Sequence, residues 1–580
     1  MRLRRQIIAL IVALLCGRAV ASAAALQVAI RPVVHGEALR LDSLRYQDAA
    51  AETYSLTRLS YLLSGFALQR EDGAWVELPG QSAWMDAGQQ RMETRLEAVP
   101  EGKYRALRFY VGLDAKTNAA PANGFSPDDP LNPNLNGLHW NWQGGYIFLA
   151  AEGMYRSSNG ELKGFAYHLA RAPQRTRIHL TAPLDLSHDA SALLDFDIAA
   201  LLNAPRPLAF GRDGEATHSR EGDPIAAALV ANLPGAFRVR QVLSSVPQMA
   251  RPVPARPLFL PSKYTPYRFT MNATFPIPDL PRDNPLLEER VMLGRKLFTE
   301  TALSRDGILS CASCHQASAA FADPRRVSRG VRNQAGTRNA MPLFNLAWKT
   351  SFFWDGRAPS LREQALMPIQ DHAEMDETLE RVTVKLAAKE DYPALFAAAF
   401  GSPEITSEKI GLALENYLLT LTTHDSKFDR AMRGKGALSA DEQRGFELFM
   451  TEYDPRTQQF GADCFHCHGG PLFTDHQFHN NGLVPSGSDP GRFRVTGRES
   501  DRGKFATPSL RNIARTAPYM HDGRFATLDE VIEHYSTGVQ RSATLDPNLA
   551  KHPDGGLHLS AADRHALVAF LNTLTDESLP

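Results

Sequence analysis

The sequence predicts a multidomain protein, in which an N-terminal all-β, sandwich-like domain is followed by two all-α domains in tandem. Three observations carry this prediction. Aromatic and β-branched runs separated by polar turns fill residues 24–245, nine prolines fall within 246–281, and helical periodicity begins near residue 284. We therefore expect domains at 24–245, 282–435 and 436–580, with 246–281 as a stiff, proline-rich linker.

Composition and the first residues bear on location. Lys and Arg number 63 against 64 Asp and Glu, a net charge of −1, which argues against a nucleic-acid or anionic-membrane partner. Arginines at positions 2, 4 and 5 precede an apolar run at 7–16, and Ala21-Ser22-Ala23 resembles a signal-peptidase site. We predict a signal peptide (1–23) cleaved near Ala23 and a periplasmic protein. An uncleaved anchor is the alternative, although the run is short for a bilayer span, and we expect no membrane span in the mature chain.

The strands of the N-terminal domain are predicted from local composition. The clearest runs are 104–113, 146–150 and 177–180, which are rich in aromatic and β-branched residues. Long polar stretches interrupt them, such as 118–137 with its run of Asp, Pro and Asn. An antiparallel sandwich or barrel is the class that this pattern favours.

The helical part contains an internal echo. Residues 286–298 have apolar positions at helical spacing, and Ser439 opens a capping box for a helix through Phe449. Ser560 caps a last helix at 561–574, whose apolar residues share one face. The string LGRKLF precedes one Cys-rich string and RGFELF precedes another, so we expect two related subdomains.

Cysteine spacing predicts the cofactor. Apart from Cys16, the only cysteines are Cys311 and Cys314, followed by His315, and Cys464 and Cys467, followed by His468. Two disulfides are conceivable in an exported chain, but each pair belongs to a C-x-x-C-H string, the c-type haem attachment pattern. We therefore predict two covalently bound c-type haems, with His315 and His468 as iron ligands.

The next question is what binds the other face of each iron. A haem with two strong protein ligands transfers electrons, whereas one with an open face can react with peroxide. No His or Met lies between Gln316 and Gly336, and the next histidine after His315 is His372. The first haem is therefore expected to be the open one.

These residues resemble a known family. Residues 284–580 are similar to the bacterial di-haem cytochrome c peroxidases and MauG-type enzymes, and the carrying strings are LGRKLF, SCASCH, TRNAMPLFN, FFWDGRAPSLREQA and ATPSLRNIARTAPYMHDGRFATLDEV. The resemblance implies tandem cytochrome c-like domains, a first haem that reacts with hydrogen peroxide, a second haem that stores oxidising equivalents, and a calcium ion between them.

The same resemblance implies roles for individual residues. Gln364 and Glu374 match distal residues of the peroxide pocket, where a carboxyl can move a proton between peroxide oxygens. Pro368 matches a proline that lines the open haem, and Trp354 matches the tryptophan between the haems. On the residues alone, a surface position would be the favoured interpretation for Gln364 and Glu374, and core packing is the alternative for Trp354. The matching calcium ligands are Asn339, Thr516 and Pro518, whose oxygen atoms suit a hard cation.

The second haem distinguishes the two branches of the family. Classical peroxidases have Met at the position of Tyr535, whereas MauG-type enzymes have Tyr, so the resemblance implies Tyr535 as an iron ligand. Met520, for which we favour a core position, and His534 are rival ligands. Val331 stands where ordinary peroxidases carry a gating His, which again favours the MauG branch.

The N-terminal domain resembles the MbnP-like proteins, copper-binding partners of MauG-type enzymes. The match rests on LSYLLSGFALQREDGAW, LHWNWQGGYIFLAAEG and FAYHL. In that family a Trp is oxidised to kynurenine, and the candidates here are Trp140 and Trp142, which would share a face if they lie on a strand. Core packing is the alternative for both. Candidate copper ligands are His139, His168 and His179, with His35, His188 and His218 weaker.

Together these points predict an exported di-haem peroxidase that uses hydrogen peroxide to oxidise a Trp of its own N-terminal domain, which is tied to the oxidant at high effective concentration. One alternative is a peroxide-detoxifying cytochrome c peroxidase with a small redox donor, such as a cytochrome c or copper protein. The other is a copper-binding protein whose haems only transfer electrons.

Overall fold

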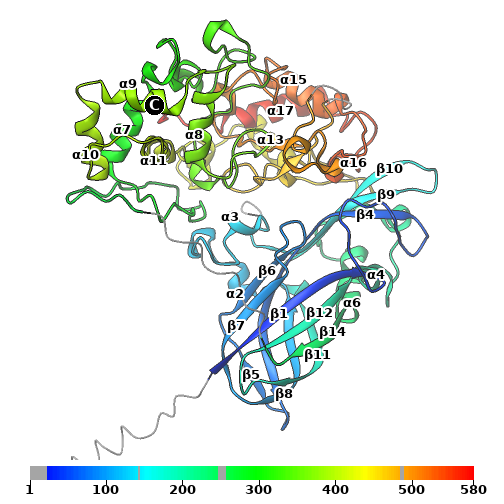
Figure 1. Ribbon diagram of the computed structural model, residues 1–580. Helices are drawn as coiled ribbons and strands as arrows, with labels where there is room; N and C mark the ends of the chain where they lie inside the picture. Colours follow the sequence, from blue (N-terminus) through cyan, green and yellow to red (C-terminus); the bar gives the residue numbers. More distant parts are fainter. Residues whose placement is uncertain (1–22, 141–143, 246–256, 484–488, 580) are drawn as a thin grey trace, which may run out of the picture. The chain divides into compact units, whose positions relative to one another are not determined.

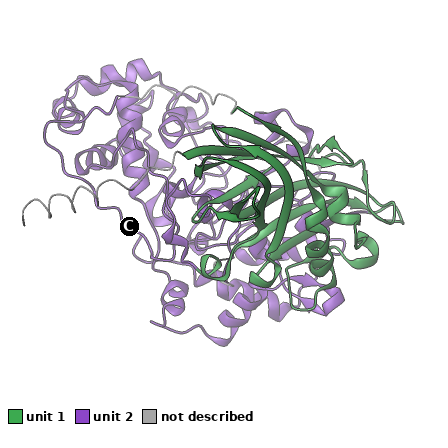
Figure 2. Cartoon of the chain, turned by 90° about the horizontal axis from the view of Figure 1, so that it is seen from below, with its two compact units in different colours: residues 1–119, 146–161, 166–251 green, residues 120–145, 162–165, 252–580 purple. Residues whose placement is uncertain are grey.

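The computed structural model describes residues 23–140, 144–245, 257–483 and 489–579. The predicted signal peptide therefore lies outside the described residues except for Ala23, where the first strand begins. The chain forms two compact units (Figure 2). Unit 1 comprises 1–119, 146–161 and 166–251, and unit 2 comprises 120–145, 162–165 and 252–580. None of the helices among the described residues has the length and apolar character needed to cross a membrane.

Unit 1 is built on two sheets, which confirms the predicted β-rich N-terminal fold. The first sheet has the order β14-β12-β1-β2, and β7 also pairs with β1 (Figure 1). Its strands are β1 (Ala23–Val34), β2 (Glu37–Ala38), β7 (Glu93–Pro100), β12 (Ala190–Asp197) and β14 (Phe237–Leu243). Strands β1 and β12 run parallel, from Leu26 opposite Ala190 to Val33 opposite Asp197, unlike the antiparallel pairing expected. Parallel pairing is possible because a long stretch of chain connects the two strands.

The second sheet has the order β11-β8-β4-β9-β10-β13, and β3, β5 and β6 also pair with β4. On β11, buried and exposed residues alternate along the whole strand, as expected for a sheet with one face in the core. Its strands are β3 (Tyr46–Gln47), β4 (Thr53–Arg70), β5 (Trp75–Glu77), β6 (Ser82–Asp86), β8 (Lys103–Val111), β9 (Ile147–Arg156), β10 (Leu162–Ala170), β11 (Thr176–Asp185) and β13 (Ala216–Thr217). The unit also contains helices α2 (Ala115–Asn118), α4 (Ile198–Asn203), α5 (Phe210–Asp213) and α6 (Pro224–Ala236).

Unit 2 is helical in its C-terminal part, as predicted. The first half has one apolar core around Trp348, which is fully buried. Its helices are α7 (Glu288–Phe298), α8 (Leu361–Gln370), α9 (Leu379–Ala387), α10 (Tyr392–Phe400), α11 (Ser407–Thr420) and α12 (Lys427–Met432). The second half has its own core around Phe570, with α13 (Ala440–Met450), α14 (Phe493–Thr496), α15 (Leu528–Glu533), α16 (Pro547–Ala550) and α17 (Ala561–Asn572).

The sequence echo corresponds to a repeated helix crossing. Gly294 on α7 lies against α11, where an added Cβ would be 2.0 Å from the carbonyl oxygen of Ala413. Gly445 on α13 lies against α17, where an added Cβ would be 2.0 Å from the carbonyl oxygen of Ala566. Each glycine therefore lets two helix backbones approach closely, and any side chain would separate them. The predicted caps Ser439 and Ser560 are also present at α13 and α17.

The C-terminal part of the proline-rich segment is packed onto unit 2. Phe275 is fully buried, and the indole nitrogen of Trp348 donates to the carbonyl oxygen of Pro276 at 2.8 Å. The buried guanidinium of Arg290 donates to the carbonyl oxygens of Leu258 and Phe259, at 2.8 and 2.9 Å. Within 257–281 the chain is therefore held by specific contacts as well as being stiffened by proline.

Candidate functional site: two C-x-x-C-H turns and the residues around them

The two C-x-x-C-H strings form nearly identical turns. Residues Cys311–Ser313 and Cys464–His466 are single 3-10 turns. The backbone N–H of His315 donates to the carbonyl oxygen of Cys311 at 2.9 Å, and that of His468 donates to Cys464 at 2.9 Å. All four thiols are free, so neither string contains a disulfide. Each turn thus presents two thiols and one imidazole together.

The ring orientation of both histidines suits iron ligation. The Nδ1 atom of His315 lies 2.9 Å from the carbonyl oxygen of Phe321, and the Nδ1 atom of His468 lies 3.2 Å from that of Phe473. A carbonyl oxygen only accepts, so Nδ1 carries the proton and Nε2 keeps a lone pair for a metal. Burial lowers the pKa of both imidazoles, which also favours the neutral, ligating form. These residues fit a c-type haem at each string.

The residues predicted for the peroxide pocket lie on and just after α8. Gln364 and Pro368 are four residues apart on this helix, so they share one face, and both are half-buried. Glu374 follows in the adjoining turn, where the backbone N–H of Met375 donates to the carbonyl oxygen of Pro368 at 3.2 Å. The turn folds back onto the helix end and brings Glu374 close to Pro368.

The carboxyl group of Glu374 has an unusual environment. Burial, with a smaller contribution from Asp371, raises its pKa to about 7, and Arg357 opposes the shift. The Glu374 charge in turn adds to the effect of burial in raising the pKa of the Cys311 and Cys314 thiols. Glu374 therefore lies near the first haem string and can both accept and give up a proton near neutral pH.

The loop that carries Val331 is fastened to this pocket. The backbone N–H of Val331 donates to the carbonyl oxygen of Glu374 at 2.7 Å, and Val331 is buried. Next to it, Arg332 pairs with Asp376 at 2.7 Å. His372 also contacts Asp376, and its side chain is 91% exposed, so it points to solvent.

Trp354 and Asn339 are joined directly. The indole nitrogen of the buried Trp354 donates to the carbonyl oxygen of Asn339 at 2.9 Å. The backbone N–H of Asn339 donates to the carbonyl oxygen of His521 at 2.8 Å. Asn339 is therefore next to the segment that contains Thr516 and Pro518, the two other predicted calcium ligands. The residues fit the predicted oxygen-ligand set, in which Asn339 would join the cation to Trp354.

Tyr535 lies beside the second haem string. Burial raises its pKa to about 12, an adjacent amide of Asn481 opposes this, and the Cys467 and Cys464 thiols contribute to it. The Nδ2 atom of Asn481 donates to the Tyr535 hydroxyl at 3.3 Å and lies 3.6 Å from the sulfur of Met520. Met520, for which we expected a core position, is half-buried and lies in the same pocket. His534 instead directs its Nε2 atom to the carbonyl oxygen of Asn481, at 3.0 Å.

A buried ion-pair network adjoins the second string, and sequence reasoning missed it. His466 lies 2.9 Å from Asp463 and 3.1 Å from Glu452, and Lys551 bonds to both carboxylates. Although burial lowers the pKa of His466, Asp463 and Glu452 raise it to about 9. Lys551 supplies a cation to both carboxylates, so this group is an ion-pair network rather than a free metal site. No local sequence signal connects residues a hundred positions apart.

Of the two tryptophans predicted as substrates, only Trp140 lies within the described residues. The backbone N–H of Trp140 donates to the carbonyl oxygen of Gly145 at 2.9 Å. It belongs to unit 2 and packs, half-buried, against the core of the second haem subdomain. It lies outside the named strands. Trp142 lies outside the described residues.

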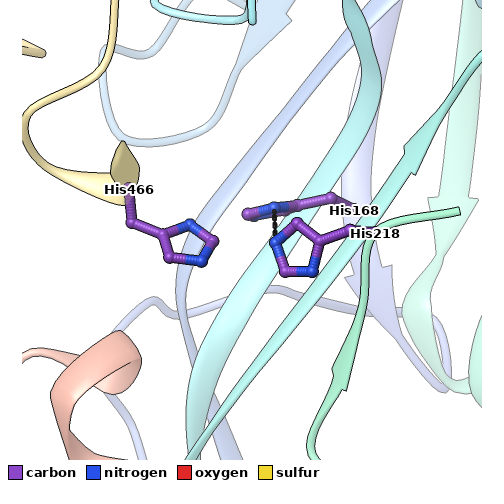
Figure 3. Close-up of side chains that lie close together, drawn as sticks. All are labelled: His168, His218 and His466. Carbon is purple, nitrogen blue, oxygen red and sulfur yellow. Dashed lines mark hydrogen bonds between the residues drawn. The ribbon is translucent and has the colours of Figure 1, made fainter. Parts of the chain in front are cut away.

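The histidines predicted to bind copper do not form one group. His168 on β10 is buried, its Nδ1 atom lies 3.0 Å from Nε2 of His218 (Figure 3), and its Nε2 atom lies 2.9 Å from Glu152. His179 is exposed on β11, four strand positions from β10 and on the order of 19 Å away. His168 and His179 are therefore separate candidates. The partner of His168 is His218, which we had ranked lower because a lone His carries little signal. His139 belongs to unit 2.

Comparisons with known proteins agree with this arrangement. The family model of the di-haem cytochrome c peroxidases matches residues 288–437, and that of MbnP matches residues 23–216. The methylamine utilization protein MauG of Methylorubrum extorquens is 39% identical over 301 residues, which are 51% of this chain and 81% of that protein. Cytochrome c551 peroxidase of Nitrosomonas europaea is 37% identical over 268 residues, 45% of this chain and 77% of that protein.

Among solved structures, a MauG-like protein associated with microbial copper homeostasis is 35% identical. It covers 54% of this chain and 97% of its own, with a TM-score of 0.49. From the sequence relatives and the two family matches, the chain belongs to the di-haem cytochrome c peroxidase family, a family of oxidoreductases that act on peroxide and that implies two c-type haems, and it carries an MbnP region at its N-terminal end.

Proposed function

We propose that this chain is an exported, periplasmic di-haem peroxidase of MauG type that uses hydrogen peroxide to oxidise Trp140 in its own MbnP region to kynurenine. Tyr535 binds the second iron, calcium is bound by Asn339, Thr516 and Pro518, and the modified region binds copper. The proposal extends the family assignment to a particular substrate and a particular residue.

One observation carries the choice of substrate. The MbnP family match spans residues 23–216, yet 120–145 belong to the same compact unit as the haem strings. Within that unit Trp140 packs against the apolar core that includes Phe465, and Cys464 also packs against this core. Trp140 and the second haem string therefore share one apolar core, which favours removal of electrons from this indole.

The peroxide pocket supplies the proton transfers. Glu374, with a pKa near 7, takes a proton from peroxide and returns it to the leaving oxygen, while Gln364 and Pro368 shape the pocket. A bound haem supplies the redox chemistry. Trp354 provides an oxidisable ring for electron transfer. Its indole N–H donates a hydrogen bond to the carbonyl oxygen of Asn339, which is too weak a base to remove the proton.

The overall reaction balances with peroxide as the only oxidant. Two molecules of hydrogen peroxide each deliver one oxygen atom to the indole and leave as water, which opens the five-membered ring to N-formylkynurenine. Hydrolysis then releases formate and leaves kynurenine. No external electron donor is needed, in contrast to peroxide detoxification, in which a small redox protein must reduce the haems.

Copper binding is proposed at His168 and His218 in unit 1. Their imidazole nitrogens lie 3.0 Å apart, and imidazole is a ligand that Cu(II) accepts. The Glu152 carboxylate lies 2.9 Å from the other nitrogen of the His168 ring and would orient that ring. Arg58 pairs with Glu152 at 2.9 Å and holds its carboxylate in place. Copper titration of the peroxide-treated protein should show weaker binding for His168→Ala and His218→Ala. Unchanged binding in both would contradict this site, whereas His179→Ala is the matched control and should bind normally.

The substrate proposal is tested by peptide mass spectrometry of the haem-loaded full chain after peroxide treatment. We expect modification at Trp140, with the Trp84 peptide unmodified because that indole is in the β core. Glu374→Gln should abolish the modification, and Trp140→Phe should remove it from this peptide. Modification of Trp142 alone would shift the assignment, and unmodified peptides with rapid turnover of a reduced cytochrome c would support detoxification instead.

A further inference from the structure

Two side chains of different chemistry meet one amide at the second haem string. The Nδ2 atom of Asn481 lies 3.3 Å from the hydroxyl oxygen of Tyr535 and 3.6 Å from the sulfur of Met520. Both are residue types that bind haem iron, one through an anionic oxygen and the other through a neutral thioether. Both groups therefore lie next to the same amide nitrogen of Asn481.

We propose that Asn481 is a positioning residue that selects Tyr535 rather than Met520 as the iron ligand of the second haem. Met520 is then a reserve ligand that binds when Tyr535 is removed or poorly held. The inference rests on the proposed function only in taking this string as a haem site with Tyr535 as its normal ligand.

Asn481 is itself firmly placed. The Nε2 atom of His534 lies 3.0 Å from the backbone carbonyl oxygen of Asn481, so the rival ligand His534 serves to anchor the backbone at Asn481. The preceding Asn480 donates from its Nδ2 atom to the hydroxyl of Thr544 at 2.8 Å and accepts from the backbone N–H of Gly482 at 3.0 Å. These bonds hold the backbone at Asn481, from which its side chain contacts Tyr535 and Met520.

The chemistry of the amide explains the preference. The Nδ2 group can only donate, and its hydrogen bond is much stronger to a phenolate oxygen than to a thioether sulfur, which is a weak acceptor. Asn481 therefore stabilises Tyr535 in the charged form that binds iron, whereas it stabilises Met520 only weakly. Loss of the amide removes this advantage and leaves Met520 within reach.

The experiment uses the haem-loaded full chain and reads the ligands of the second haem directly. We would compare Tyr535→Phe, Asn481→Ala and the double variant Tyr535→Phe/Met520→Leu by near-infrared magnetic circular dichroism and electron paramagnetic resonance of the ferric protein. Haem content per chain and far-ultraviolet circular dichroism check that each variant is folded and loaded. Met432→Leu, at an exposed methionine, is the matched control and should match the wild type.

The outcomes separate this proposal from the one on which it rests. We expect a low-spin His–Met signature in Tyr535→Phe, a partial one in Asn481→Ala, and a high-spin second haem in the double variant. A high-spin second haem already in Tyr535→Phe, or a wild-type spectrum in Asn481→Ala, would overturn the selection by Asn481. If Tyr535→Phe has the wild-type spectrum, Tyr535 is not the ligand, and the proposed ligand set fails together with the selection.

Discussion

Replacing Glu374 by Gln tests the peroxide pocket and its electrostatics in one variant. Gln keeps the size of the side chain and resembles the protonated carboxyl, but it cannot transfer a proton. Burial is the main reason that the pKa of Glu374 is raised from 4.5 to about 7, so the folded protein binds its proton more tightly than the unfolded chain does. The substitution should therefore affect both stability and reaction rate, each with its own pH dependence.

The stability effect follows from the pKa difference. A raised carboxyl pKa does not change the free energy of unfolding near pH 4, where the group is protonated in both the folded and the unfolded state. It lowers the free energy of unfolding most above pH 7, where the group is ionised in both states. The difference of 2.5 pH units corresponds to about 3 kcal/mol, at about 1.36 kcal/mol per unit. Because Glu374 is half-buried and partly screened by solvent, this is an upper bound. Glu374→Gln should thus be more stable than wild type by up to about 3 kcal/mol near pH 8 and equally stable near pH 4.

The assays are urea unfolding at the two pH values and stopped-flow reaction with hydrogen peroxide. In wild type the rate should rise as the pH increases through about 7, because the ionised carboxylate is the base. Glu374→Gln should lose this rise and react about 10²- to 10⁴-fold more slowly. Glu363→Gln, at an exposed position on α8, is the control. A variant that keeps the wild-type rate and pH profile would refute the role of Glu374, and equal stability at both pH values would refute its burial.

Three further substitutions have expected outcomes. Trp354→Phe should leave the initial peroxide reaction in place and slow oxidation of the substrate tryptophan by an order of magnitude or more, as measured by quenched-flow peptide analysis; an unchanged rate would exclude electron transfer through this ring. Asp429→Asn breaks a fully buried, bidentate pair with Arg511, at 2.7 and 2.9 Å, and should cost about 3–5 kcal/mol in urea unfolding. Gly445→Ala, which forces a methyl group against the carbonyl oxygen of Ala566, should cost about 1–3 kcal/mol, and a neutral result would show that α13 and α17 move apart easily.

The sequence allowed prediction of features that depend on short-range patterns. The C-x-x-C-H strings and the capping boxes are local patterns. The two repeated helix strings each contain a glycine, and in the structure each of these glycines lies at a helix crossing. The change from strand-rich to helical composition near residue 284 likewise matches the observed elements.

Features that depend on long-range pairing were not predictable in this way. His168 and His218 are fifty residues apart and meet only because β10 pairs with β13, just before His218. A lone histidine gives no indication of its neighbour, so the sequence does not distinguish His168 from His179, on a distant strand, as a copper ligand. Asn481 had no distinguishing signal at all, because a single Asn in a loop is ordinary and its importance comes from two contacts made at positions 39 and 54 residues away.

The boundary between the compact units has a kinetic consequence. It cuts through the region matched by MbnP, and Trp140 belongs to the unit with both haem strings. If Trp140 is held there in the resting protein, its oxidation is intramolecular and requires no encounter between two molecules. The rate constant for Trp140 modification should then be unchanged on hundred-fold dilution at constant peroxide concentration. A rate that falls in proportion to protein concentration would mean that one molecule oxidises another, and the packing of Trp140 would then be structural rather than catalytic.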